Sequence, residues 1–261
     1  MPTFRMSSTL TLLGVLLAAA ACDGDAAPAP APDPSASYLA EVRTALDRTR
    51  NSPFSWGAAG DVPGNFAGQA PDIHGEIRTS GFYDPGTRNF YRNLSIEGAY
   101  AKTWKGSAQT VIGNDFYLSD QPPQGEYGPA SHIDLDRVPP DTILYSIDRD
   151  DPTGIDRFTA AVRTVMDKAG HQYRGTFDPG PDPAGHFLPL GAPVVGGTGV
   201  FTLITGDAGE VETIDVMVRP GDGSRLRLKT LFTFHGRQFP IKPPPAADEA
   251  DPGLLRKDGE Q

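Results

Sequence analysis

Residues 211–234, VETIDVMVRPGDGSRLRLKTLFTF, contain two runs of alternating apolar and polar residues joined by Pro-Gly-Asp-Gly. Successive side chains of a β-strand point to opposite faces, so this alternation predicts strands with one covered face. The apolar set is Ile214, Val216, Val218, Leu226, Leu228, Phe232 and Phe234. The pattern predicts two antiparallel strands, at 211–218 and 226–234, in a sheet that is covered on one side only.

Most of the remaining chain also has the pattern of β-strands. Six further runs are flanked by glycine-rich or proline-rich turn signals, and each predicts a strand. They are residues 73–79, 89–96, 100–105, 109–118, 173–177 and 200–205. Residues 140–147 fit a short helix or a strand equally well. The sequence therefore predicts a chain dominated by antiparallel sheet.

Two segments predict helices. Residues 35–50 place Leu39, Val42 and Leu46 at helical spacing, with a serine available at the start. Residues 153–170 begin with the capping-box-like sequence Thr153-x-x-Asp156 and end at a glycine. We expect both helices to pack an apolar face on the sheet.

The N-terminal segment predicts export and lipidation. Residues 10–21, LTLLGVLLAAAA, form an uncharged apolar run after Arg5, as in a signal peptide. The run is shorter than the roughly 17–25 residues that cross a bilayer as a helix. Residues 17–22, LAAAAC, resemble the lipobox of bacterial lipoproteins, with Ala19 where leucine is commonest. We expect cleavage before Cys22, the only cysteine, and acylation there by chains such as palmitate.

This anchor would hold the protein on the extracytoplasmic face of the cell membrane. An ordinary secretory cut after Ala21, with Cys22 left as a free thiol, stays the alternative. We expect a signal peptide at 1–21, an Ala/Pro-rich tether at 22–34, one domain at 35–242 and a disordered tail at 243–261. The formal net charge of −10 argues against nucleic acid as a partner.

Several short segments resemble a known family. They are Thr103-Trp104, VIGNDFYL at 111–118, YRGTFD at 173–178, GDAGEV at 206–211 and GRQFPI at 236–241. With the order of the expected elements, they resemble the LppX/LprAFG family of actinobacterial lipoproteins and the related LolA/LolB carriers, over roughly residues 36–245. The resemblance implies an α+β fold: a curved antiparallel half-barrel of about eight or more strands with helices on its concave face.

The resemblance also implies a hydrophobic cavity between sheet and helices that accepts acyl chains. The candidate ligand-binding residues are Phe158, Val162, Ile214, Val216, Val218, Leu226, Leu228, Phe232 and Phe234. Each of them could equally be an ordinary core residue. The expected function is therefore to bind or carry a lipid or other hydrophobic ligand. The alternative is an envelope protein-interaction module with a filled core and a partner that the sequence does not name.

The motifs of common enzymes and metal sites are absent from the sequence. There is no Gly-x-Ser-x-Gly elbow, no His-Glu-x-x-His and no cysteine pair. The pair His74 and Glu76 is expected to be exposed on a strand, and the aspartates at 148, 150 and 151 to form a solvated turn before a helix. We expect neither an enzyme nor a metal or cofactor site. The loop at 178–199 could be a lid or an insertion without a role.

The lipidation site is tested by replacing Cys22 with serine. Because the thiol is the only acylation point expected, Cys22→Ser should yield an uncut or soluble protein that no longer partitions into the detergent phase of Triton X-114. Unchanged partitioning of the variant would contradict the lipoprotein interpretation.

Overall fold

A computed structural model describes residues 34–63, 74–98, 106–121, 128–138, 149–178, 198–219 and 225–251. These residues belong to one compact unit, Pro34–Gln261. Cys22, the tether, the strand expected at 100–105, the ambiguous segment 140–147 and most of the 178–199 loop lie outside the described residues. Within the described part of the chain, no helix is both long and apolar enough to cross a membrane.

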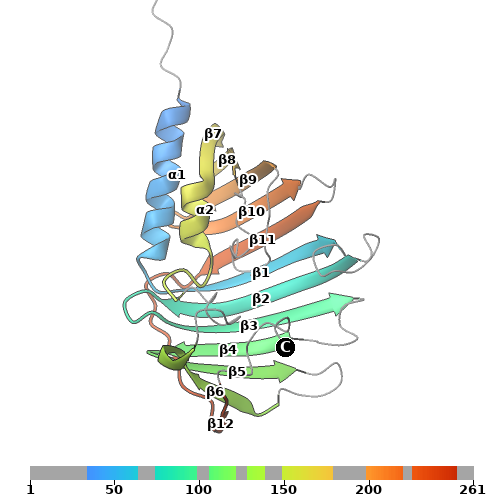
Figure 1. Cartoon of the computed structure of the whole chain (residues 1–261). Helices are drawn as coiled ribbons and strands as arrows, with labels where there is room; N and C mark the ends of the chain where they lie inside the picture. The colour runs from blue at the N-terminus through green and yellow to red at the C-terminus, as the bar shows by residue number, and fades with distance from the viewer. Residues whose placement is uncertain are drawn as a thin grey trace, which may run out of the picture. The chain divides into compact units, whose positions relative to one another are not determined.

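A single sheet of twelve strands dominates this unit. The strands are β1 (Phe54–Pro63), β2 (His74–Asp84), β3 (Asn89–Gly98), β4 (Gly106–Ile112), β5 (Asp115–Gln121), β6 (Ala130–Asp134), β7 (Val162–Ala169), β8 (Gln172–Phe177), β9 (Thr198–Thr205), β10 (Val211–Arg219), β11 (Leu226–Thr233) and β12 (Ala247–Glu249). Their order is β12-β6-β5-β4-β3-β2-β1-β11-β10-β9-β8-β7. Neighbouring strands are antiparallel except β12 and β6, which are parallel. The predicted α+β half-barrel is confirmed: the sheet is open, curved and accompanied by helices (Figure 1).

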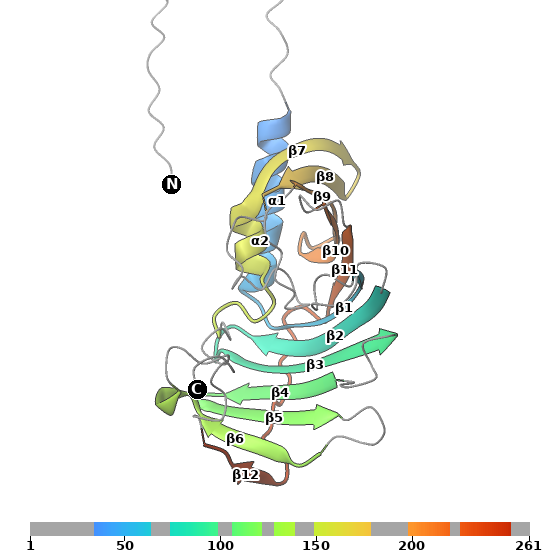
Figure 2. The same cartoon turned by 45° about the vertical axis from the view of Figure 1, so that its right-hand side comes forward.

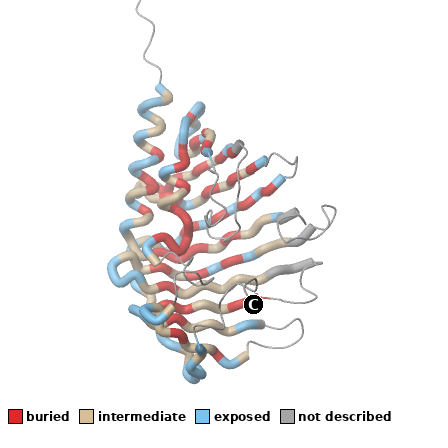
Figure 3. The backbone as a smooth tube through the Cα atoms, viewed as in Figure 1, coloured by how far each residue is buried: buried red, intermediate tan, exposed pale blue. Residues whose placement is uncertain are grey.

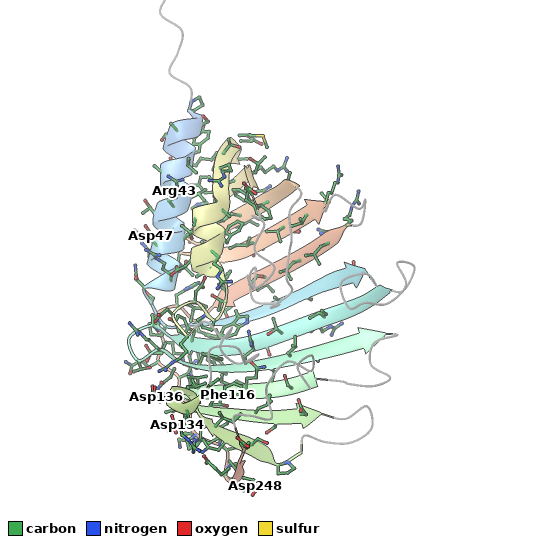
Figure 4. All side chains as sticks on the ribbon, in the orientation of Figure 1. Arg43, Asp47, Phe116, Asp134, Asp136 and Asp248 are labelled. Carbon is green, nitrogen blue, oxygen red and sulfur yellow. The ribbon has the colours of Figure 1, made fainter. Side chains whose placement is uncertain are left out.

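The helices lie on the concave face of the sheet. Helix α1 (Ser35–Arg50) and helix α2 (Ile155–Ala161) lie side by side over β7–β11 in both orientations shown (Figures 1 and 2). A short 3₁₀ helix, η3 (Leu135–Arg137), follows β6. The buried stripe of α1 contains Val42 and Leu46, whereas Arg43 and Asp47 lie on the side away from α2 (Figure 4). The period of 3.6 residues thus gives α1 one face for the core and one for solvent.

Polar contacts from Glu41, Thr49 and Arg50 hold α1 in place. Glu41 accepts hydrogen bonds from Lys168 of β7 at 2.5 Å and from Tyr173 of β8 at 2.7 Å. The Lys168 hydrogen bond, followed by that of Tyr173, holds the pKa of Glu41 below its ordinary value. Near the other end, Arg50 pairs with Asp156 of α2 at 3.0 Å. The buried Thr49 hydroxyl accepts a hydrogen bond from the Val211 amide at 2.8 Å, so α1 is tied to β7, β8, α2 and β10.

Glycines opposite aromatic residues mark places where the strands approach most closely. Gly81 is paired with Trp56, and a Cβ at Gly81 would lie 2.5 Å from the indole ring and would collide with the carbonyl oxygen of Tyr91. Gly175 is paired with Phe201 in the same way, with the ring 2.6 Å from a Cβ. A missing side chain lets the ring of the neighbouring strand cover the backbone, and such glycine positions allow a sheet to bend.

The helix predicted at 153–170 is only half correct. Helix α2 ends at Ala161, and Val162 has φ −60° and ψ 123°, which starts strand β7. The second half contains the β-branched residues Val162, Thr164 and Val165, which disfavour a helix, and it gains cross-strand partners in β8. The α2 cap also differs, because Asp151 Oδ2 accepts the hydrogen bonds of the first amides, from Asp156 at 3.0 Å and from Arg157 at 3.1 Å. Asp151 is buried, which corrects the expectation of a solvated turn.

Other expected boundaries also need correction. The run at 109–118 forms two strands, β4 and β5, because Gly113 adopts φ 58° in a tight turn. Strand β11 ends at Thr233, and Phe234 turns away from the core with φ 56° and 56% exposure. Strands β1 and β6 were not expected. The chain also differs from the disordered tail expected at 243–261, since Ala247–Glu249 form β12.

A histidine holds β12 against the sheet. His132 of β6 contacts Asp115 of β5 through Nε2 at 2.9 Å and Glu249 of β12 through Nδ1 at 2.6 Å. Arg137 pairs with Glu249 at 3.3 Å, and the Ala250 amide donates to the His132 carbonyl at 2.9 Å. The hydrogen bond to Asp115, followed by that to Glu249, raises the pKa of His132. Protonated His132 donates to both carboxylates and relieves their repulsion.

The sheet bend is tested by two glycine substitutions. Gly175→Ala places a Cβ against the Thr164 carbonyl and the Phe201 ring, so its free energy of unfolding should fall by about 1–3 kcal/mol in chemical denaturation. Gly57→Ala is the matched control, because a Cβ there meets nothing within 4 Å. Equal stability of the two variants would contradict the close approach at Gly175.

The histidine contact predicts a pH dependence. A group whose pKa is raised by folding contributes stability that is complete below its unfolded pKa, about 6.5 for histidine, and that disappears as pH rises through the folded value. The thermal midpoint of the wild type should therefore exceed that of His132→Gln most clearly below about pH 6.5, and the difference should shrink at higher pH. In Asp115→Asn and Glu249→Gln backgrounds this pH dependence should weaken. A difference that grows with pH would disprove the contact's role.

Candidate ligand-binding face

A continuous row of large apolar side chains runs across the concave side of β1–β6. We call these six residues the floor row: Phe54, Tyr83, Phe90, Val111, Phe116 and Ile133, each paired with the next across neighbouring strands. All six are buried. The ring of Phe54 meets that of Tyr83 edge to face at 5.8 Å and that of Phe232 at 5.5 Å. The floor row therefore continues into the core below the helices.

Eight of the nine predicted ligand-binding residues lie in that core. Phe158, Val162, Ile214, Val216, Val218, Leu226, Leu228 and Phe232 are buried in one hydrophobic cluster with residues of α1. The ring of Phe158, on α2, packs edge to face on Phe177 and Phe201 at 5.4 Å each. The ninth residue, Phe234, lies apart, with its ring 6.2 Å from that of Phe239. Contact of any of these residues with a ligand stays a prediction.

The concave face of β3–β6 is covered less completely. A second row runs parallel to the floor row, and we call it the middle row: Phe232, Trp56, Gly81, Arg92, Gln109, Leu118 and Ser131. Its members on β11, β1 and β2 are buried, whereas Arg92, Gln109 and Leu118 on β3–β5 are partly exposed (Figure 3). Leu94, next to Arg92 on the same face of β3, is also partly exposed. This surface combines apolar side chains with polar ones at the edge of the core.

Arg92 is the most unusual member of the middle row. Its Nε and Nη2 atoms donate to Gln109 Oε1 at 3.1 and 2.5 Å, and its guanidinium lies 6.0 Å from the Phe90 ring. Desolvation lowers the pKa of Arg92 to about 10, so the group remains charged at neutral pH. The alternation of Phe90, Arg92 and Leu94 was the available signal in the sequence, because it places a cation on an apolar face.

The outer face of the sheet carries shallow hollows. One of about 460 Å³ is lined by residues that include Met166, Arg174, Val200, Met217 and Arg225, and one of about 470 Å³ by residues that include Gly57, Ser80, Ser95, Lys229 and Leu231. A smaller hollow of about 290 Å³ shares residues with both. This outer face carries both basic and acidic side chains, and it is partly apolar because Met166 is 63% and Leu231 48% exposed.

The acidic and histidine residues considered in the sequence make other contacts where the structure describes them. The side chain of His74 is not described, Glu76 pairs with Arg78 at 2.9 Å, and Tyr83 donates to the Asp150 carbonyl at 2.8 Å. Over the described ranges, no cluster of three His, Cys, Asp or Glu side chains could hold a metal ion. The His132 contacts escaped sequence analysis because its partners are 17 and 117 residues away.

Comparison with solved structures finds proteins of similar fold. No family model matches the sequence, and no curated protein matches it. The fold is similar to the crystal structure of the lipoprotein LppX from Mycobacterium tuberculosis, with a TM-score of 0.44 and 11% sequence identity, over 79% of this chain and 99% of that chain.

Proposed function

We propose that the chain is an extracytoplasmic lipoprotein that binds or carries a lipid or other amphiphile on its concave face. One observation carries the proposal: α1 and α2 cover the concave face over β7–β11, while Leu94, Leu118 and their neighbours on β3–β5 stay partly exposed beside the buried floor row. Apolar surface left beside a core gains roughly 25 cal/mol per Å² when a ligand covers it. A long acyl chain fits that requirement.

The N-terminal sequence supports the location of this activity. We propose a signal peptide at residues 1–21, acylation at Cys22 and a tether at 22–34 that holds the domain off the extracytoplasmic face of the membrane. An anchored binding protein stays beside the bilayer that supplies and receives lipids. The proposed role is binding, not catalysis.

A second candidate function uses the other side of the sheet. The hollows on the outer face combine exposed Met166 and Leu231 with Arg225 and Lys229. Exposed apolar area bordered by charge is typical of surfaces that bind proteins. An envelope module with a filled core would bind an acidic protein partner there and would need no lipid.

Two neighbouring residues on β3 separate these candidates. Leu94 lies on the concave face, and Ser95 lines a hollow of the outer face. Leu94→Trp should reduce the lipid that co-purifies with the protein, measured by native mass spectrometry, by about tenfold, because the ring fills the surface that the acyl chain would cover. Ser95→Trp, the matched control, should leave bound lipid unchanged.

These positions avoid the packed core. A tryptophan at Val216 would force volume into a buried site and cost about 1–3 kcal/mol or more, which confounds binding with folding. Thermal midpoints of both β3 variants should stay close to that of the wild type. Absence of bound lipid in the parent protein, or unchanged lipid in Leu94→Trp, would contradict the proposal and favour the protein-binding alternative.

A further inference from the structure

The partners of Arg92 differ from those of three other arginines, Arg78, Arg88 and Arg227. Arg78 pairs with Glu76 at 2.9 Å, Arg88 with Asp150 at 2.9 Å and Arg227 with Asp215 at 2.7 Å. Arg92 has no carboxylate partner among the residues that the structure describes, and its hydrogen bonds go to the neutral Gln109 amide. A partly desolvated cation without a counter-charge costs stability, so its presence on an apolar face needs an explanation.

The Arg92 guanidinium also has N–H donors that its bonds to Gln109 do not use. Arginine carries five N–H donors, and the bonds to Gln109 Oε1 use the Nε and Nη2 atoms. Nη1 has no hydrogen-bond partner in the described part of the chain. Arg92 as a whole residue is only partly buried. A bidentate anion such as a phosphate or a carboxylate is the group that best matches unused guanidinium donors.

A second donor without a partner lies in the same row. The Trp56 Nε1 atom is buried and makes no hydrogen bond within the described residues. The register places Trp56 two strands from Arg92, with Gly81 between them. The Cζ2 and Cη2 edge of the indole lies over Gly81, and Nε1 is two bonds from Cζ2. The glycine thus brings the indole toward Arg92 without an intervening side chain.

The surroundings of Arg92 are suited to an acyl chain. Phe90 and Leu94 flank it along β3, and Leu118 lies beyond Gln109 in the middle row. Thr79, which is paired with Leu94, is satisfied by its own hydrogen bond to the Asn93 carbonyl at 2.8 Å. The unpaired groups described for Arg92 and Trp56 are N–H donors, and a ligand would supply the acceptors.

We propose that Arg92 and the Trp56 indole N–H bind the anionic head group, a phosphate or a carboxylate, of an amphiphile whose chain lies along Leu94 and Leu118. This inference rests on the proposed lipid-binding function and specifies its ligand as an anionic, single-headed amphiphile. Arg92 supplies charge and bidentate geometry, and the indole supplies one further donor. A neutral lipid with the same chain would offer these donors only uncharged oxygen acceptors and would bind more weakly.

The test compares three lipids with one acyl chain in common. The probes are 1-oleoyl-lysophosphatidate, oleate and monoolein, titrated below their micelle concentrations into the chain from residue 22 onward with Cys22→Ser. Trp104→Phe leaves Trp56 as the only tryptophan, so its fluorescence reports on the site directly. Lysophosphatidate or oleate should bind about tenfold more tightly than monoolein, as expected for a charge-assisted hydrogen-bond pair.

Variants then assign the preference to Arg92. Arg92→Gln should abolish the preference and change monoolein affinity by less than about twofold, and Arg92→Lys should retain part of it. Arg174→Gln, on the outer face, should leave the preference intact. Circular dichroism and thermal midpoints check that each variant is folded. The ratio between the two anionic lipids tells whether phosphate or carboxylate is the preferred head group.

The outcomes separate this inference from the function on which it rests. Equal affinity for all three lipids, or an unchanged preference in Arg92→Gln, overturns the head-group site while lipid binding stands. Failure of every lipid to bind overturns both. Inorganic phosphate that binds alone, with the same dependence on Arg92, also overturns the inference, because the site would then hold a free anion without a chain.

Discussion

The whole arrangement depends on how tightly the strands can bend around the helices. At Gly81 and Gly175 the neighbouring strand and an aromatic ring occupy the space where a Cβ would stand. At Gly199 the ring of Phe177 fills that space. A flat sheet of this width would leave its apolar face open, whereas a bent one wraps that face around α1 and α2. The three glycines therefore allow the close approach of strands and rings on the concave side of the sheet.

Among the described residues, α1 and α2 cover the concave side unequally, because both helices lie at the end of the sheet formed by β7–β11. The bonds from Glu41 and Thr49 bind α1 to β7, β8 and β10, so its apolar stripe serves those strands. The floor row extends the core under β1–β6, yet the next residues, such as Leu94 and Leu118, remain partly exposed. Protein interiors are normally close-packed, and the proposed ligand would cover this partly exposed margin of the described core.

Sequence periodicity predicted the elements whose buried face is visible in their own residues. Strands β10 and β11 and helix α1 each bury one face. The apolar residues of each segment therefore recur with the period of a strand or a helix. Val162–Ala169 was misassigned because its apolar spacing suits a helix, while the partner strand that decides the matter lies elsewhere in the sequence. Gly113 and Phe234 change direction through positive φ angles that no periodicity contains. The candidate site was missed for the same reason: Arg92, Trp56 and Gly81 form a row only after three strands are paired.

An acidic chain can still select an anionic ligand if the selection acts at short range. With a formal net charge of −10, the surface does not steer anions from a distance, and at physiological salt such fields fade within about 8 Å. Apolar contact of a chain with Leu94 and Leu118 needs no steering, and it would bring a head group next to Arg92, where low local dielectric strengthens the attraction. Apolar contact of the acyl chain would thus bring the ligand to the site, and Arg92 would determine which head group is preferred. That order accounts for a costly cation on the inner side of the sheet, where its described hydrogen bonds go to the neutral Gln109 amide.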